Sequence, residues 1–241
     1  MSFAIQWLRS LIFNFLMYLV MPIIGLLYLP WAIASPQGAM AACHKYCDVV
    51  LWLARWILGL RVEYRGTPPT GEVMIAAKHQ SFFDVLAIFN PAPRGKFIMK
   101  SILKYAPVIG WFGLRIGCVP VDRGKRGAAI SKMLSDVKAG AALPGQLIIY
   151  PQGTRTAPGE YRPYKKGTGA LYHQLSQPCV PVATNIGMFW PKRGVYRKPG
   201  VAVVEYLDPI APGMETADFM AHLEKVIETA SNALNAEVPH D

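Results

Sequence analysis

A histidine and an aspartate stand five residues apart in the segment KHQSFFD (78–84), between two apolar stretches of the chain. His79 directly follows a predicted strand, and Asp84 lies in the first turns of the helix expected next. A carboxylate placed there can hold one imidazole nitrogen while the other faces outward as a general base. The pattern equally fits a structural helix start, with Ser81 as N-cap and Asp84 near the positive helix end. By themselves the residues leave both interpretations open.

Two arginines follow apolar strands further along the chain. Arg123 comes after one predicted strand, and Arg155 follows another and a Pro-x-Gly-Thr turn. Two guanidinium groups at one end of a sheet can bind a phosphate bidentately, and the backbone N–H groups of Gly153 and Thr154 can add an anion-binding nest. Solvated arginines at strand ends are the structural alternative.

After residue 60, short β-branched runs alternate with helical stretches, with Pro and Gly at the joints. This alternation predicts an α/β fold with a mainly parallel sheet of about seven strands flanked by helices. In such sheets, ligand sites gather at the carboxyl ends of the strands, where the polar motifs fall. We expect strands at 61–65, 73–77, 96–100, 116–121, 146–150, 179–185 and 201–207, and helices near 82–90, 101–114, 126–142, 166–176 and 215–235.

The N-terminal part of the chain is predicted to be a membrane-embedded helical segment. Residues 10–43 contain no charged residue and no histidine. The apolar stretch 11–29 is about as long as the roughly 20 residues that cross a bilayer. We expect Pro22 and Gly25 to break this stretch and Pro30 to end it.

A second segment, residues 43–60, has the pattern of an amphipathic helix that can lie in the membrane interface. Its polar stripe would consist of His44, Asp48 and Arg55. Three arrangements are open: a cleaved signal peptide, a single crossing helix, and a broken hairpin seated in one leaflet. We favour the hairpin, and predict a membrane-anchoring domain at 1–60 and an α/β domain at 61–241.

The net charge of +10 is unevenly distributed along the chain. Residues 94–126 and 151–200 each carry eight basic residues and one acidic residue, whereas residues 201–241 carry eight acidic residues and one basic residue. A clustered positive surface suggests phosphorylated small molecules, lipid headgroups or nucleic acid as partners. The sequence has no zinc-knuckle spacing and no RNA-binding motif, which argues against nucleic acid.

The cysteines are predicted to be small reduced hydrophobes. They lack the C-x-x-C spacing of a metal or redox site and stand in apolar surroundings. The four are Cys43, Cys47, Cys118 and Cys179.

Four segments resemble, in order and roughly in spacing, the sequence blocks of the glycerolipid acyltransferases, the lysophosphatidic acid acyltransferase (1-acyl-sn-glycerol-3-phosphate acyltransferase, PlsC-like) family. KHQSFFD (78–84) resembles its H-x-x-x-x-D block, and GCVPVDR (117–123) resembles its second block, which ends in arginine. YPQGTRT (150–156) resembles its Phe-Pro-Glu-Gly-Thr-Arg-Ser block, and CVPVATN (179–185) resembles its fourth, proline-containing block. The apolar N-terminus is also typical of bacterial members.

The resemblance implies that His79 takes the proton from the acceptor hydroxyl and that Asp84 fixes the tautomer of the imidazole. Direct attack of the acceptor on a thioester needs no enzyme nucleophile, and Ser81 lacks a G-x-S-x-G elbow. The expected residues for substrate-phosphate binding are Arg123, Gly153, Thr154 and Arg155, with Lys100 and Gln152 as secondary candidates.

The expected reaction moves a fatty acyl group from acyl-CoA or acyl-carrier protein to the sn-2 hydroxyl of lysophosphatidic acid. The product would be phosphatidic acid, made in phospholipid biosynthesis at the inner (cytoplasmic) membrane, with the catalytic domain facing the cytoplasm. The bilayer, the lysolipid and the acyl donor are the expected partners. No metal or other cofactor is implied.

Gln152 departs from the family pattern, which usually has glutamate at this position. This departure keeps open another acceptor, such as a lyso-ornithine lipid or a lysophospholipid in remodelling. A hydrolase and a non-catalytic membrane-binding protein are further alternatives. The intact pair of His79 and Asp84 argues against the non-catalytic one. Lys78 replaces a common asparagine, and Tyr150 and Thr156 are mild replacements.

Overall fold

The computed structural model describes residues 2–121, 127–128, 131, 135 and 144–239. Within these residues, seven strands form one sheet in the order β1-β7-β6-β2-β5-β3-β4. All neighbouring strands are parallel except β6 and β7. This confirms the predicted α/β fold with a mainly parallel sheet. The strands are β1 (Leu60–Arg65), β2 (Met74–Ala77), β3 (Lys96–Lys100), β4 (Val119–Val121), β5 (Leu147–Ile149), β6 (Cys179–Thr184) and β7 (Gly200–Tyr206).

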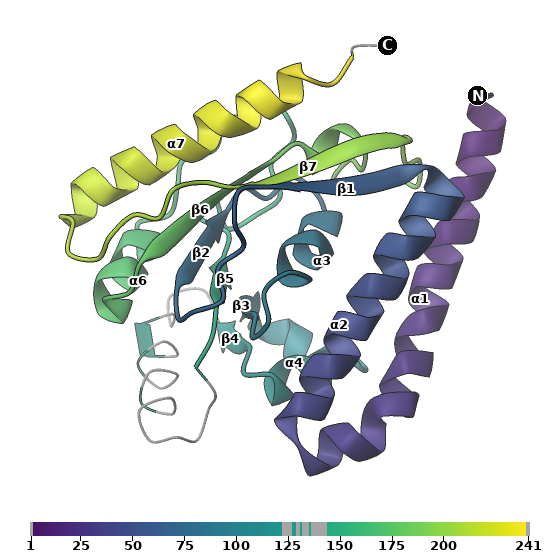
Figure 1. The fold of residues 1–241 in the computed structure, drawn as a ribbon, viewed down its shortest axis with the longest axis horizontal. Coiled ribbons are helices and arrows are strands. Elements are labelled where there is room, and N and C mark those ends of the chain that lie inside the picture. Colours follow the sequence, from purple (N-terminus) through teal and green to yellow (C-terminus); the bar gives the residue numbers. More distant parts are fainter. Residues whose placement is uncertain (1, 122–126, 129–130, 132–134, 136–143, 240–241) are drawn as a thin grey trace.

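Helices cover both faces of the sheet (Figure 1). α6 (Gly167–Leu175) and α7 (Thr216–Ala236) lie on one face. There Tyr172 stacks on Phe219 with ring centroids 3.7 Å apart, and Leu223 is fully buried. β2, β5 and β6 are buried along their whole length, as continuous apolar runs in the centre of a parallel sheet should be.

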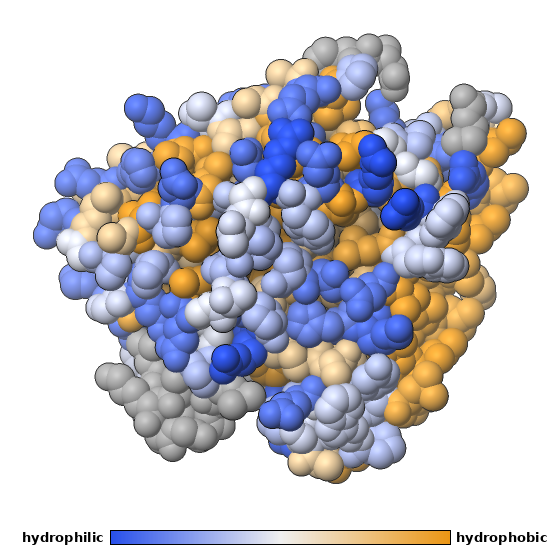
Figure 2. Space-filling model, in the orientation of Figure 1, coloured by the Kyte–Doolittle hydropathy of each residue, from blue (hydrophilic) through white to orange (hydrophobic). Residues whose placement is uncertain are grey.

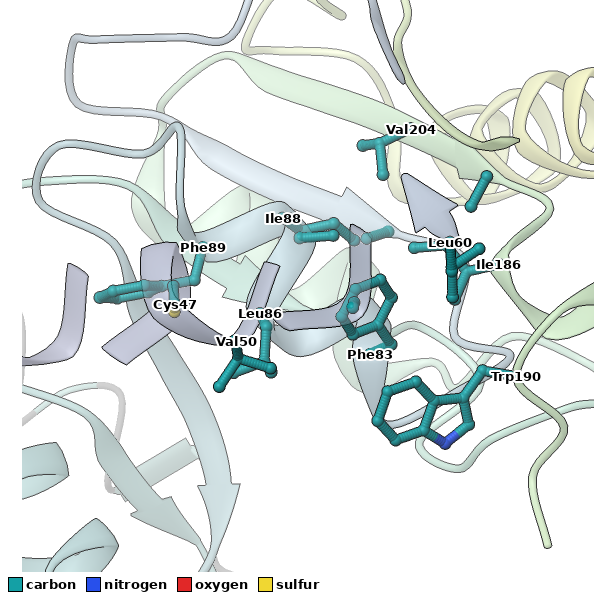
Figure 3. Packing of buried hydrophobic residues seen from close by; sticks show 14 of the residues in the cluster. Cys47, Val50, Leu60, Phe83, Leu86, Ile88, Phe89, Ile186, Trp190 and Val204 are labelled. Atoms are coloured by element: carbon teal, nitrogen blue, oxygen red, sulfur yellow. The ribbon is translucent and has the colours of Figure 1, made fainter. Parts of the chain in front are cut away.

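On the other face, α3 (Phe83–Phe89) lies between the sheet and the N-terminal helices. Figure 3 shows Leu86 of α3 next to Val50 of the N-terminal region, and Phe83 next to Trp190. The rings of Phe83 and Trp190 stack with centroids 5.0 Å apart. These residues belong to one continuous hydrophobic core, so the N-terminal helices and the sheet bury a common surface.

The N-terminal helices form a hairpin that turns at Ser35. α1 (Phe3–Ala34) precedes the turn, and α2 (Pro36–Leu53) follows it. The Ser35 hydroxyl oxygen accepts the N–H of Gln37, a serine N-cap with proline at the first helical position. Gly38 lets the helices approach closely, because a Cβ there would lie 2.5 Å from the carbonyl carbon of Trp31. By length and composition, α1 could cross a membrane.

The predicted breaks in the first apolar stretch are wrong. α1 runs through Pro22, Gly25 and Pro30 and ends only at Ala34. Each proline removes one helical hydrogen bond, but α1 packs against α2 and the core through fully buried side chains such as Phe13 and Met17. This burial stabilises the helix more than the lost hydrogen bonds weaken it.

The predicted second helix, 43–60, begins seven residues too late. α2 starts at Pro36, and a π-helical turn, η1 (Ala54–Leu58), follows it and ends at Gly59 with φ +71°. His44 is not part of a solvent-facing polar stripe, because its ring stacks on Phe89 at 4.8 Å. The division into domains 1–60 and 61–241 stays a prediction.

The predicted helix 101–114 is two short pieces in the structure. η2 (Ser101–Tyr105) is a 3-10 helix, and α4 (Ile109–Arg115) is an α-helix. Pro107 separates them because proline disfavours a helical residue before it and has no N–H to donate. The predicted helix 126–142 falls largely outside the described residues.

Candidate active site

The structure brings His79 and Asp84 into contact at the carboxyl end of β2. Asp84 Oδ2 lies 3.1 Å from His79 Nδ1 and accepts the backbone N–H groups of Gln80 and Ser81 at 2.6 and 2.8 Å. The Asp84 side chain is fully buried, and that of His79 is 15% exposed. The loop therefore folds around one carboxylate oxygen.

This geometry assigns the tautomer of His79. Two amides already donate to Asp84 Oδ2, so the oxygen acts as an acceptor and His79 Nδ1 carries the proton that faces it. In a neutral imidazole, Nε2 is then unprotonated and can accept a proton. Ser81 contributes a local helix-start hydrogen bond, since its hydroxyl oxygen accepts the N–H of Phe83 at 3.2 Å. The N-cap of α3 is Phe82 and not Ser81 as the structural alternative expected, while the histidine–carboxylate contact is present.

The segment 150–156 packs directly on the His79 loop. The ring of Tyr150 stacks on His79 with centroids 3.9 Å apart and an interplanar angle of 17°. The N–H of Thr156 donates to the His79 carbonyl at 2.7 Å. Burial raises the pKa of the Tyr150 hydroxyl well above its ordinary value, and the Asp84 charge adds to this effect.

The sequence interpretation of Tyr150 and Thr156 as mild replacements missed these contacts. β5, which ends directly before Tyr150, pairs with β2, which ends directly before the His79 loop. The position of Tyr150, an aromatic residue directly after a strand, was the available sequence signal for the stacking contact. The partner of its ring could be predicted only from the order of the strands in the sheet.

Arg155 and Thr154 lie in the turn between Tyr150 and Thr156. Arg155 is half-buried, and its Nη1 donates to the carbonyl of Lys192 at 3.2 Å. Of the two amides of the predicted nest, that of Gly153 donates to the Tyr150 carbonyl at 2.9 Å in this structure. The anion-binding role of Gly153 and Thr154 stays a prediction.

The structure does not bring the other predicted phosphate-binding residues into contact with the His79–Asp84 pair within its described residues. Arg123 lies outside the described residues. Lys100 is exposed at the carboxyl end of β3, two strands from β2. Gln152 is buried, its Nε2 donates to the Arg162 carbonyl at 3.3 Å, and its Oε1 has no protein partner in the described part of the chain. Gln152 thus links the turn 150–156 to the chain at Arg162.

An ion pair with a buried lysine lies behind the His79 loop. Lys78 is 3% exposed, and its Nζ lies 2.7 Å from both carboxylate oxygens of Glu228 on α7. The hydroxyl of Tyr164 donates to Glu228 Oε1 at 2.9 Å. A cavity of about 290 Å³ beside this pair is lined by Lys78, Gln80 and residues of α7, and its lining does not include His79. Sequence analysis missed Glu228 because nothing local links it to residue 78.

No group of three His, Cys, Asp or Glu side chains within the described ranges is placed to hold a metal ion. All four cysteines are free thiols. Burial raises the pKa of Cys118 to about 11, so this thiol is protonated at neutral pH. That is the reduced apolar state expected from the sequence.

Comparison with known proteins shows the family of this chain. Residues 60–185, more than half of the chain, match the protein-family profile described as Acyltransferase. The chain belongs to the acyltransferase family. The matched residues run from β1 to the end of the fourth sequence block, and they include the His79–Asp84 pair and the stacked segment 150–156.

Two relatives of this acyltransferase-family chain have the same name. The 1-acyl-sn-glycerol-3-phosphate acyltransferase of Saccharomyces cerevisiae is 32% identical over 211 residues, which cover 75% of this chain and 68% of that protein. The protein of the same name from Pseudomonas aeruginosa is 28% identical over 166 residues, 67% of this chain. The match spans 63% of the length of the Pseudomonas protein.

The fold of this family member also matches a solved structure. The crystal structure of the 1-acyl-sn-glycerophosphate (LPA) acyltransferase PlsC from Thermotoga maritima superimposes with a TM-score of 0.80. The match covers 97% of each chain at 20% sequence identity. It therefore includes the N-terminal hairpin as well as the sheet.

Proposed function

We propose that this chain transfers a fatty acyl group from an acyl thioester, acyl-CoA or acyl-carrier protein, to the sn-2 hydroxyl of lysophosphatidic acid. The main observation in support of this proposal is the contact between His79 and Asp84. The loop that contains His79 packs against the turn that contains Arg155. The similarity to the 1-acyl-sn-glycerol-3-phosphate acyltransferases of Saccharomyces cerevisiae and Pseudomonas aeruginosa supports the choice of acceptor.

In the proposed mechanism, His79 Nε2 accepts the proton of the acceptor hydroxyl as its oxygen attacks the thioester carbonyl. Asp84, held by two backbone amides, stabilises the imidazolium that forms. When the tetrahedral intermediate collapses, the carbon–sulfur bond breaks and the thiolate takes the proton from His79. The products are phosphatidic acid and the free thiol, and the enzyme returns to its starting state. No covalent acyl-enzyme is required.

The acceptor phosphate is proposed to bind at the turn that carries Arg155. A guanidinium can bind phosphate bidentately, and the Thr154 amide adds a neutral donor. Arg123 is proposed as the second arginine. Gln152 is turned toward the Arg162 carbonyl, so we assign it to the support of this turn and not to the choice of acceptor.

The hairpin is proposed to attach the enzyme to one leaflet of the inner membrane, with the catalytic domain on the cytoplasmic side. Figure 2 shows hydrophobic residues along the side of the molecule where α1 lies. α1 is tied to the rest of the protein near both ends: Gln6 Nε2 donates to the Arg197 carbonyl at 2.8 Å, and Arg115 Nε donates to the Ala32 carbonyl at 3.0 Å. A helix held along the domain in this way favours a hairpin that lies in the interface over a crossing helix.

An acceptor panel tests the proposed function. Purified full-length protein in detergent is given radiolabelled acyl-CoA with lysophosphatidate, other lysophospholipids or lyso-ornithine lipid, and without acceptor. We expect labelled phosphatidic acid from lysophosphatidate and little free fatty acid without acceptor. Release of fatty acid independent of acceptor would identify a hydrolase, and preference for another lysolipid would overturn the assigned acceptor.

A further inference from the structure

Outside the hairpin, exposed large hydrophobic side chains gather on one stretch of the chain. Ten such side chains are found in the described residues beyond η1, and six of them belong to η2 and α4. We call these six the η2–α4 surface: Ile102, Leu103, Tyr105, Ile109, Trp111 and Leu114. Large exposed apolar patches on soluble proteins mark sites of interaction.

The η2–α4 surface continues the exposed apolar face of α1. A Cβ added at Gly25 would lie 3.0 Å from Val108 Cγ1 and 3.5 Å from the ring of Phe112, so α4 packs against α1 at this point. Next to this contact, Leu26 and Leu27 of α1 are 70% and 73% exposed. Figure 1 shows α4 near the turn of the hairpin and on the opposite side of the molecule from α7.

Two further features hold α4 against the hairpin. Arg115 donates from Nε to the Ala32 carbonyl at 3.0 Å and from Nη2 to the Ile33 carbonyl at 2.9 Å, both in the last turn of α1. Val108, before α4, has φ +63°, a conformation that β-branched residues rarely adopt. Such a conformation persists only where the surroundings impose it. α4 therefore has a defined orientation relative to α1.

The charged residues of this stretch of the chain are all of one sign. The described residues 94–121 include five basic residues and no acidic residue. Lys100 and Lys104 are exposed on either side of the start of η2, and Lys104 Nζ lies 4.8 Å from the ring centroid of Tyr105. Aliphatic side chains combined with tyrosine, tryptophan and lysine are typical of the interface of an anionic membrane.

We propose that the η2–α4 surface is a second membrane contact, seated in the headgroup region of an anionic bilayer beside the hairpin. This inference rests on the membrane attachment proposed above. Lysines also attract an acidic carrier protein, but six large hydrophobic side chains continuous with α1 fit a bilayer better. η2 begins where β3 ends, so this contact turns the carboxyl edge of the sheet, where His79 lies, toward the lipid surface.

The contact can be measured without any assay of activity. The full-length variant Tyr105→Cys is labelled with the environment-sensitive fluorophore NBD and reconstituted into vesicles of phosphatidylcholine and phosphatidylglycerol. Met214→Cys, exposed in the loop before α7, is the matched control. The parent chain, carried through the same labelling, corrects for its native thiols.

We expect the label at position 105 to emit at shorter wavelength in vesicles and to be quenched by nitroxide lipids. Its reduction by aqueous dithionite should be several-fold slower than at position 214. Equal reduction rates at both positions would overturn the proposal. A blue shift at position 105 that requires acyl-carrier protein would also overturn it, because it would identify a carrier-protein site. A blue shift that depends on protein concentration in the absence of vesicles would overturn it as well, because it would identify a contact between copies of the chain.

Kinetics with two acceptor forms then connect the contact to the reaction. In the double variant Tyr105→Ser/Ile109→Ser, the apparent KM for an acceptor embedded in vesicles should rise several-fold. Turnover of a short-chain monomeric acceptor should be unchanged, and Met214→Ser should behave as wild type in both assays. An equal loss with both acceptors would contradict a role in membrane contact. Should the chain acylate no lysolipid, the fluorescence result still stands by itself.

Discussion

Nδ1 of His79 faces a single oxygen, Asp84 Oδ2, which two backbone amides hold in place. We predict that His79→Ala lowers the rate of acyl transfer by about 10²–10⁴-fold, the usual contribution of a general base, without loss of folding. Asp84→Asn should also lose most of the rate, because a neutral amide cannot stabilise the imidazolium. Initial rates with lysophosphatidate, together with circular dichroism, check both. Near wild-type turnover of His79→Ala would rule out the general-base role.

Arg155 tests the proposed phosphate site at the same scale. Arg155→Lys keeps the charge but loses the planar fork that can bind phosphate bidentately. We expect acceptor affinity to fall by about 1–3 kcal/mol, with a much smaller change in the apparent affinity for acyl-CoA. Arg123→Lys should behave in the same way. Separate titrations of acceptor and acyl-CoA measure the two apparent affinities. A loss of affinity for acyl-CoA alone would assign the arginine to the donor site.

The ring and the hydroxyl of Tyr150 have different surroundings, so their contributions to stability can be separated. The ring stacks on His79, whereas the hydroxyl is buried and has no protein partner among the described residues. Tyr150→Phe keeps the stack and removes an unsatisfied polar group, so we expect the free energy of unfolding to stay constant or rise by about 1–3 kcal/mol. Tyr164→Phe is the matched control, because its hydroxyl donates to Glu228, and it should be destabilising. Denaturant unfolding of both variants measures the difference.

Among the elements, α7 is joined to the His79 loop by the Lys78–Glu228 pair. Glu228→Gln leaves the Lys78 ammonium buried without its counter-charge, which typically costs about 3–5 kcal/mol of stability. The double variant Lys78→Met/Glu228→Gln should recover part of this loss, since it buries no unpaired charge. Glu237→Gln, in an exposed pair with Arg65, should change stability little. Equal effects at positions 228 and 237 in denaturant unfolding would show that the buried pair has no special role.

For the whole molecule, the mode of membrane attachment gives a prediction about salt. Full-length protein bound to anionic vesicles should stay bound in about 1 M salt, where the Debye length is about 3 Å. Burial of the apolar face of α1 is insensitive to ionic strength, whereas attraction of the basic residues to lipid is screened. Flotation of vesicles before and after the wash measures the bound fraction. Release by salt would mean that attachment is only electrostatic.

Local patterns in the sequence were sufficient for the strands and for the contact between His79 and Asp84, but not for the bounds of the helices. The β-branched runs predicted every strand within three residues at either end, because strand formation in a buried sheet depends mainly on a short apolar run. The spacing of His79 and Asp84 predicted their contact, since a loop and the first helical turn bring these positions together without distant contacts.

Contacts between segments far apart in the chain needed the tertiary structure. The pairing of β2 with β5 places Tyr150 on His79, and the position of α7 brings Glu228 to Lys78. Packing against α2 and α4 likewise keeps α1 helical through Pro22 and Pro30, which local propensity alone would interrupt. The physical reason is the same in each case: periodicity and propensity act over a few residues, whereas strand order and helix packing are decided by the burial of the whole apolar surface.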